Sequence, residues 1–187
     1  MMKKLVLLLI FIASALSAES YNLDKSHSRV GFKIKHLAVS NVYGTFDKFD
    51  TIIEYDEKSK NITKLTATID VDSINTRNKK RDAHLKEKTF FDVSKYPNIK
   101  FELVKILKDK IVANITMKNI TKEIEFDYEN YGTIKDPWGN ERLGFYLEGK
   151  INRTDFGLEQ SGLMETTSLV LSKTVKITAD IQAKRAK

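Results

Sequence analysis

Apolar and polar residues alternate along most of this chain, and this pattern limits the possible folds more than any other feature of the sequence. Successive side chains of a β-strand point to opposite faces, so a period of two residues is typical of strands that bury one face. The alternation is clear in residues 30–34, 65–71, 99–103, 111–117, 124–128, 143–151 and 175–183, and residues 42–55 indicate one or two further strands. The sequence therefore predicts an all-β domain of about eight strands.

The first 18 residues have the layout of a secretory signal peptide. Lys3 and Lys4 precede an uninterrupted apolar run at 5–12, and small residues follow at 13–18. The apolar run is too short to span a bilayer, which needs about 20 residues. We expect cleavage after Ala18, a mature domain of residues 19–187, and a protein that works in the periplasm or is secreted.

Many antiparallel strands with few interruptions fit either a sandwich or a closed barrel. Both prolines, Pro97 and Pro137, lie in the short connections between the predicted strands. Closure removes exposed strand edges, which favours a barrel in an exported β-protein. An eight-stranded barrel has an interior just wide enough for side chains or for one small ligand.

Two segments lack the alternation. Residues 78–90 contain good helix formers, and we expect a short helix that is capped near Asn78. Side chains three or four residues apart share one face of a helix, and the ones that do so here are Arg81, His84, Leu85 and Lys88. Residues 153–167 are irregular, and we expect a loop with a helical turn there.

The sequence shows no arrangement that is typical of a metal site or of an enzyme. It has no cysteine, and its three histidines, His27, His36 and His84, lack the paired spacing of metal ligands. No nucleophile elbow is present. We therefore expect no catalytic residue, no metal and no cofactor. We also expect no nucleic-acid partner, because the predicted signal peptide implies export and the aromatic residues are not interleaved with the basic cluster.

Several short blocks occur in order along the mature chain: 21–36 (YNLDKSHSRVGFKIKH), 42–46 (VYGTF), 69–76 (IDVDSINT), 81–85 (RDAHL), 90–97 (FFDVSKYP), 120–123 (ITKE) and 153–157 (RTDFG). Together they resemble the YceI family of exported bacterial lipid-binding proteins. The resemblance implies an extended, lipocalin-like, eight-stranded antiparallel barrel with a long internal hydrophobic tunnel. It also implies an amphiphilic ligand, such as a polyisoprenoid, an isoprenoid quinone or a fatty amide, and it points to a homodimer.

A long apolar ligand would draw its binding energy from an apolar wall. Burying each CH₂ group is worth about 0.8 kcal/mol, so a chain of roughly 20 carbons gains well over 10 kcal/mol before the costs of association. Each inward-facing apolar residue either lines such a tunnel or belongs to an ordinary core. The predicted lining residues are Phe32, Ile34, Phe46, Ile69, Val71, Phe101, Ile115, Met117, Phe126, Phe145, Leu147 and Phe156.

Much of the net charge of +7 lies in residues 77–88, which contain six basic and two acidic side chains. Three interpretations remain open for this segment. Arg81, His84 and Lys88 bind the polar head of the ligand at a tunnel mouth, since Arg forms directional bonds to oxygen. Alternatively the helix is simply solvated, or it docks the protein transiently to an anionic membrane or host surface.

Overall fold

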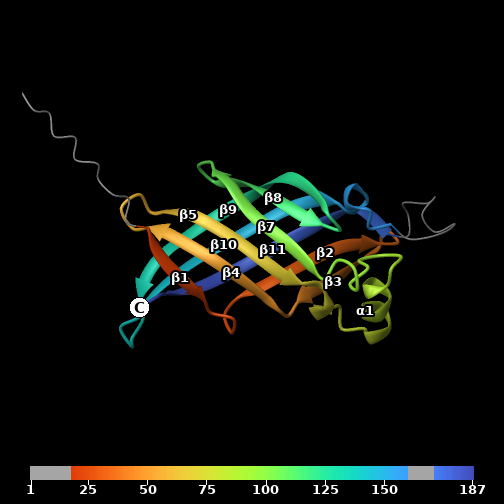
Figure 1. Cartoon of the computed structure of the whole chain (residues 1–187), viewed down its shortest axis with the longest axis horizontal. Helices are drawn as coiled ribbons and strands as arrows, with labels where there is room; N and C mark the ends of the chain where they lie inside the picture. The colour runs from red at the N-terminus through yellow and green to blue at the C-terminus, as the bar shows by residue number, and fades with distance from the viewer. Residues whose placement is uncertain (1–17, 160–170) are drawn as a thin grey trace, which may run out of the picture.

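The computed structural model describes residues 18–159 and 171–187 (Figure 1). The predicted signal peptide, apart from Ala18, and the second half of the predicted insertion at 153–167 lie outside the described residues. The strands are β1 (Glu19–Leu23), β2 (Arg29–His36), β3 (Ser40–Phe46), β4 (Phe49–Asp56), β5 (Asn61–Asp70), β6 (Ile74–Asn75), β7 (Asn98–Ile106), β8 (Lys110–Met117), β9 (Ile120–Lys135), β10 (Glu141–Asn152) and β11 (Leu171–Arg185). The helical segments are η1 (Val71–Ser73), α1 (Lys79–Lys86) and η2 (Arg153–Phe156).

The strands form a closed antiparallel barrel, as the alternation and the resemblance predicted. The hydrogen-bonded order β1-β4-β5-β7-β8-β9-β10-β11 returns to β1, so eight strands complete the ring and a sandwich is ruled out. Along one of its edges, the long strand β11 pairs with two different strands. Its end at 183–185 pairs with β1, and its earlier residues 171–180 pair with β2.

The barrel is less complete at the end where β2 and β3 extend beyond β1 and β4. There β6 has only two residues and pairs with β3, and none of the described pairings joins it to β7. The chain between β6 and β7 contains α1 and the connection 87–97, which lie beside the ends of β2 and β3 (Figure 1). This end of the barrel is therefore bounded by helix and loop instead of by a continuous sheet.

Helix α1 begins as predicted, with the side chain of Asn78 accepting a hydrogen bond from the Arg81 N–H at 3.1 Å. It ends at Lys86, four residues earlier than the predicted end at 90. None of its own residues is buried, whereas Phe90 and Phe91 are buried just beyond it. Because these two rings must reach the core, the backbone leaves the helix at Glu87, where it becomes extended.

The opposite end of the barrel is filled by large side chains. Tyr55, Phe145 and Leu143 are almost completely inaccessible to solvent. The rings of Tyr128 and Phe145 meet edge to face with centroids 6.3 Å apart, a geometry that stabilises aromatic pairs beyond their area burial. The hydrophobic core is therefore solid at this end, and any hollow must lie elsewhere along the barrel.

Candidate functional site

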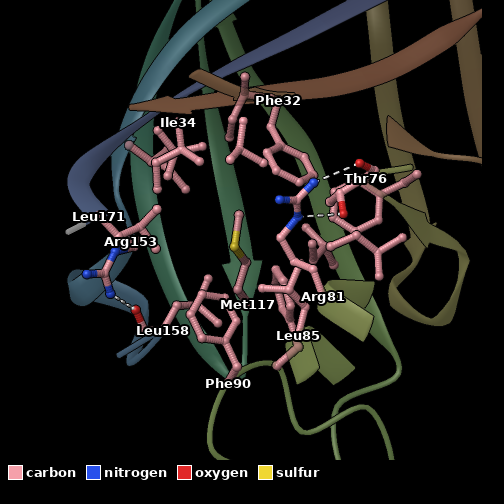
Figure 2. A pocket seen from close by; sticks show the side chains of 18 of the residues that line it. Phe32, Ile34, Thr76, Arg81, Leu85, Phe90, Met117, Arg153, Leu158 and Leu171 are labelled. Carbon is pink, nitrogen blue, oxygen red and sulfur yellow. Dashed lines mark hydrogen bonds between the residues drawn. The ribbon is translucent and has the colours of Figure 1, made fainter. Parts of the chain in front are cut away.

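An apolar cavity of about 260 Å³ lies inside the barrel at the end next to α1. Figure 2 shows Met117 projecting into its middle, with Phe90 and Leu85 on one side and Phe32 and Ile34 on another. Fifteen of the twenty lining residues are apolar, and the lining comes from β2, β3, β6, β7, β8, β10 and β11 as well as from α1, η2 and the loops. The cavity can hold an apolar group, and water would find few hydrogen-bond partners in it.

A second, smaller cavity of about 70 Å³ lies deeper in the barrel. Its lining is apolar except for Thr51, and Ile177 on β11 lines both cavities. Side chains alone therefore separate the two spaces. The packed aromatic residues described above begin with Phe145, which itself lines the second cavity, so the hollow runs along part of the barrel and not through all of it.

The structure places ten of the twelve predicted lining residues around these cavities. Phe32, Ile34, Phe46 and Met117 line the first cavity, and Ile69, Phe101, Ile115, Phe126, Phe145 and Leu147 line the second. Val71 and Phe156 line neither cavity and are 1% exposed within the core. Both lie in short 3₁₀ segments, η1 and η2, where the two-residue period no longer predicts the direction of a side chain.

Eleven further apolar residues that were not predicted also line the first cavity. They are Val42, Ile74, Leu85, Phe90, Phe91, Ile99, Ile151, Leu158, Leu171, Val175 and Ile177. The alternation itself contained a signal for some of them. Ile151, Val175 and Ile177 occupy apolar positions of predicted strands. Phe90 and Phe91 gave no such signal, because their inward position depends on where α1 ends.

Two glycines let aromatic rings lie flat against the inner wall. A Cβ atom on Gly149 would lie 2.5 Å from Cδ1 of Phe126, and one on Gly44 would lie 2.3 Å from Cζ of Phe32. Such separations are too short for non-bonded carbon atoms. The cross-strand register places each glycine opposite its phenylalanine, Phe126 with Gly149 and Phe32 with Gly44. The shape of the cavity wall thus depends on glycine at both positions.

Arg81 lies at the cavity wall and is held by Thr76 (Figure 2). Its Nε atom donates to Thr76 Oγ1 at 2.8 Å, and its Nη2 atom donates to the Thr76 carbonyl at 2.9 Å. Asp82 accepts hydrogen bonds from the N–H and the hydroxyl of Thr76 at 2.8 and 2.5 Å. This network fixes the guanidinium beside an apolar space, where it can donate to an oxygen atom of a ligand.

The other two predicted head-group residues differ from each other in position. His84 lines the first cavity, but it is exposed and its Nδ1 lies 3.2 Å from Glu87 Oε2. Lys88 is exposed and is not among the lining residues of either cavity. The expected grouping of Arg81, His84 and Lys88 assumed a helix to 90. Because α1 ends at Lys86, the spacing of four residues does not bring Lys88 onto that face.

A buried arginine, Arg153, also lines the first cavity and was not predicted as a site residue. Its Nε atom donates to the Ser172 carbonyl at 3.1 Å, and its Nη1 atom donates to the Leu158 carbonyl. These bonds join η2 to the beginning of β11. Arg153 therefore holds together the part of the rim that lies across the cavity from Arg81 (Figure 2).

Two buried hydroxyl groups have no hydrogen-bond partner in the part of the chain that the structure describes. They are Thr51 Oγ1, in the wall of the second cavity, and Tyr128 Oη, near the packed end. Burial raises the pKa of Tyr128 far above its usual value of 10.0, and the nearby Tyr55 adds to the effect. Tyr128 therefore stays neutral at any physiological pH.

The described residues contain no group of three or more His, Cys, Asp or Glu side chains that could hold a metal ion. Within the same residues, no helix is long and apolar enough to cross a membrane.

Comparison with known proteins agrees with this architecture. A family model described as the YceI-like domain matches residues 21–183. The UPF0312 protein SA2479 of Staphylococcus aureus (strain N315) is 40% identical over 164 residues, which cover 87% of this chain and 96% of that protein. The crystal structure of the Campylobacter jejuni YceI protein is 37% identical, with a TM-score of 0.73, and the match covers 89% of this chain and 98% of that one.

A more distant structure has the same fold at low sequence identity. It is a polyisoprenoid binding domain from Saccharophagus degradans that is implicated in plant cell wall breakdown, and it is 15% identical with a TM-score of 0.65. The match covers 90% of this chain and 99% of that domain. The domain match, the close relatives and the shared barrel agree, and this chain belongs to the YceI-like family.

Proposed function

We propose that this protein is a carrier that binds one long-chain amphiphile, with the apolar tail inside the barrel and the polar head at the end near α1. The observation that carries the proposal is the apolar cavity of about 260 Å³ within a closed barrel that is solid at its other end. Each CH₂ group that enters such a space is worth about 0.8 kcal/mol. A ligand with a long hydrocarbon chain gains the most from it.

The volume of the two cavities limits how much of such a ligand fits without movement of side chains. Pockets for drug-sized ligands measure about 300–1,000 Å³, and the first cavity of about 260 Å³ lies just below this range. Ile177 lines both cavities, and its rotation would join the first cavity to the second one of about 70 Å³. We therefore expect a tail to extend from the α1 end past Met117 toward Phe101, and core side chains to move as it enters.

The polar end of the ligand is assigned to Arg81, with His84 at the rim. Arg81 is already held by Thr76, so little side-chain entropy is lost when it donates a hydrogen bond. A quinone oxygen, an amide carbonyl or a phosphate oxygen is a suitable acceptor. The polyisoprenoid binding domain with the same fold is a precedent for an isoprenoid tail. Polyisoprenoids, isoprenoid quinones and fatty amides are the classes we propose.

The proposal involves binding and release without a covalent step. It also places the protein outside the cytoplasm, in the periplasm or the medium, on the strength of the signal-like sequence at 1–18. A water-filled compartment is where a carrier for such a ligand is needed, because a free hydrocarbon chain in water is strongly disfavoured.

Lipid extraction tests the proposal. The protein is expressed with its export segment, purified without detergent and extracted with organic solvent, and the extract is analysed by mass spectrometry beside a mock purification. We expect one dominant amphiphile at close to one molecule per protein. The stripped protein should then bind a polyprenol, a quinone or a fatty amide again. Failure to recover any lipid, together with failure to bind all three probes, would refute the carrier function.

A further inference from the structure

The hairpin between β2 and β3 has an unusual tip. The Val39 N–H donates to the His36 carbonyl at 3.2 Å, and the two central residues of this turn, Leu37 and Ala38, have φ values of 50° and 57°. Positive φ at both central positions is what a type I′ turn requires, and Asn-Gly or Gly-Gly pairs adopt it most easily. Leucine and alanine are strained there, because their Cβ atoms approach the backbone too closely.

The same tip exposes large apolar side chains. Val39 is 86% exposed, and Leu37 is 50% exposed. A polar sequence such as Asn-Gly would remove both the strain and the exposure, so stability of the isolated protein does not explain these residues. Burial in an apolar environment outside the protein would compensate for them.

The tip belongs to the rim of the cavity. His36 and Val42, on the two strands that lead into and out of the hairpin, both line the first cavity. Figure 1 shows the ends of β2 and β3 at the same end of the barrel as α1. Any surface that covers this tip therefore faces the opening through which a ligand would pass.

The charges around the tip indicate what kind of surface it fits. Lys35 next to the turn, and Lys79, Lys80 and Lys88 in and after α1, are exposed, and no ion pair of the described residues involves them. Among the acidic groups in and beside α1, Asp72 pairs with Lys86 at 3.0 Å, Asp82 accepts hydrogen bonds from Thr76, and Glu87 lies beside His84. Exposed lysines near an apolar anchor are attracted by anionic lipid head groups.

We propose that the 37–39 tip inserts into an anionic lipid bilayer and that the lysines around it contact the head groups. The inference rests on the proposed carrier function. It adds that ligand is collected and delivered at a membrane surface, with the cavity opening turned toward the lipid. Other occupants of the tip, such as a second copy of this chain, are outcomes that the tests below would reveal.

Tryptophan fluorescence tests the insertion directly. The only tryptophan of the sequence is Trp138, which is 81% exposed in the connection between β9 and β10, at the other end of the barrel. The double variant Val39→Trp, Trp138→Phe moves the single indole to the tip. We expect its emission to shift to shorter wavelength with phosphatidylcholine vesicles that contain phosphatidylglycerol, and to be protected from acrylamide quenching. Wild-type Trp138 should show neither effect, and an unshifted tip indole would overturn the proposal.

A matched pair of charge substitutions tests the energetic contribution of the tip. Val39→Asp should weaken binding to the same vesicles at least tenfold and slow ligand transfer from them. Ile134→Asp, at a 72% exposed position near the opposite end, should change neither. Equal vesicle binding by both variants would contradict the proposal, as would concentration-dependent dimers that Val39→Asp abolishes without vesicles. A protein that binds lipid in solution but does not dock would refute only this inference, and one that docks but holds no lipid would refute only the carrier function.

Discussion

Substitution of Met117 by tryptophan tests whether the hollow in the barrel is the place where the ligand lies. Met117 ends β8, is 5% exposed and projects into the middle of the first cavity (Figure 2). An indole at this position has room, because the cavity measures about 260 Å³. We therefore expect the free energy of unfolding to fall by less than the roughly 1–3 kcal/mol that is typical of an overpacked core.

Ligand affinity should respond much more strongly than stability. If the indole displaces three methylene groups of the tail, binding loses about 2.4 kcal/mol at about 0.8 kcal/mol for each group. Since about 1.4 kcal/mol corresponds to a factor of ten, the expected loss of affinity is about 50-fold. Displacement of a fluorescent fatty-acid probe measures the affinity, and urea unfolding followed by circular dichroism measures the stability.

The matched control adds the same side chain on the outer face of the same strand. Asn114 alternates with the inward residues of β8 and pairs with Glu102 and Glu123 on the neighbouring strands, both of them exposed. Asn114→Trp should bind the probe as the wild type does. If Met117→Trp folds stably and also binds with unchanged affinity, the tail does not occupy this cavity and our reasoning is refuted.

Gly149→Ala brings a Cβ atom within 2.5 Å of Phe126, so we expect a loss of about 1–3 kcal/mol in urea unfolding; an unchanged midpoint would show that the ring can move freely. Tyr128→Phe removes a buried hydroxyl that has no hydrogen-bond partner among the described residues. We expect the free energy of unfolding to rise by about 1–3 kcal/mol. A less stable variant would show that the hydroxyl has a partner outside the described residues. Hydrogen bonds from Asn140 and Arg142 outweigh the opposing effect of burial and lower the pKa of Asp136 from 3.8 to about 2. This carboxylate therefore contributes stability above about pH 3.8 that is lost as the pH falls through 2, and an NMR titration midpoint near 3.8 would contradict the assignment.

The fold could be predicted in outline because each strand has one buried face. The two-residue period depends only on local strand geometry, and it predicted the segments that became β2, β5 and β7 to β11. Residues 42–55, which were predicted as one or two strands, fall into β3 and β4. The short strand β1 was not predicted, and its place in the ring depends on its pairing with the distant strands β4 and β11.

The residues around the hollow were predictable as inward-facing, but the hollow itself was not. Val71 continues the apolar pattern of its predicted strand, and Phe156 lies in the segment predicted to be irregular, yet both are in short 3₁₀ segments, η1 and η2, that bury them in the core. The space left inside depends on which side chains meet across strands, as with Phe126 over Gly149. Register and side-chain packing decide this, and neither is encoded in the period of one strand.

Among the polar residues of the site, contacts between sequence neighbours were predictable, and contacts between distant segments were not. Asn78 was correctly predicted to cap α1, because capping involves neighbours in the sequence. The contacts of Arg153 with the Leu158 and Ser172 carbonyls include one to a residue 19 positions later in the sequence. The position of Lys88 outside the cavity follows from an early helix end, which the burial of Phe90 and Phe91 imposes.

A crystal structure of the protein, expressed with residues 1–18, purified without detergent and never exposed to added lipid, tests the central claim most directly. We predict continuous, elongated electron density that begins beside Arg81, passes Met117 and reaches toward Phe101, with Ile177 displaced to join the two cavities. A barrel whose inner side chains have closed over an empty first cavity, in protein that also yields no extractable lipid, would contradict the account.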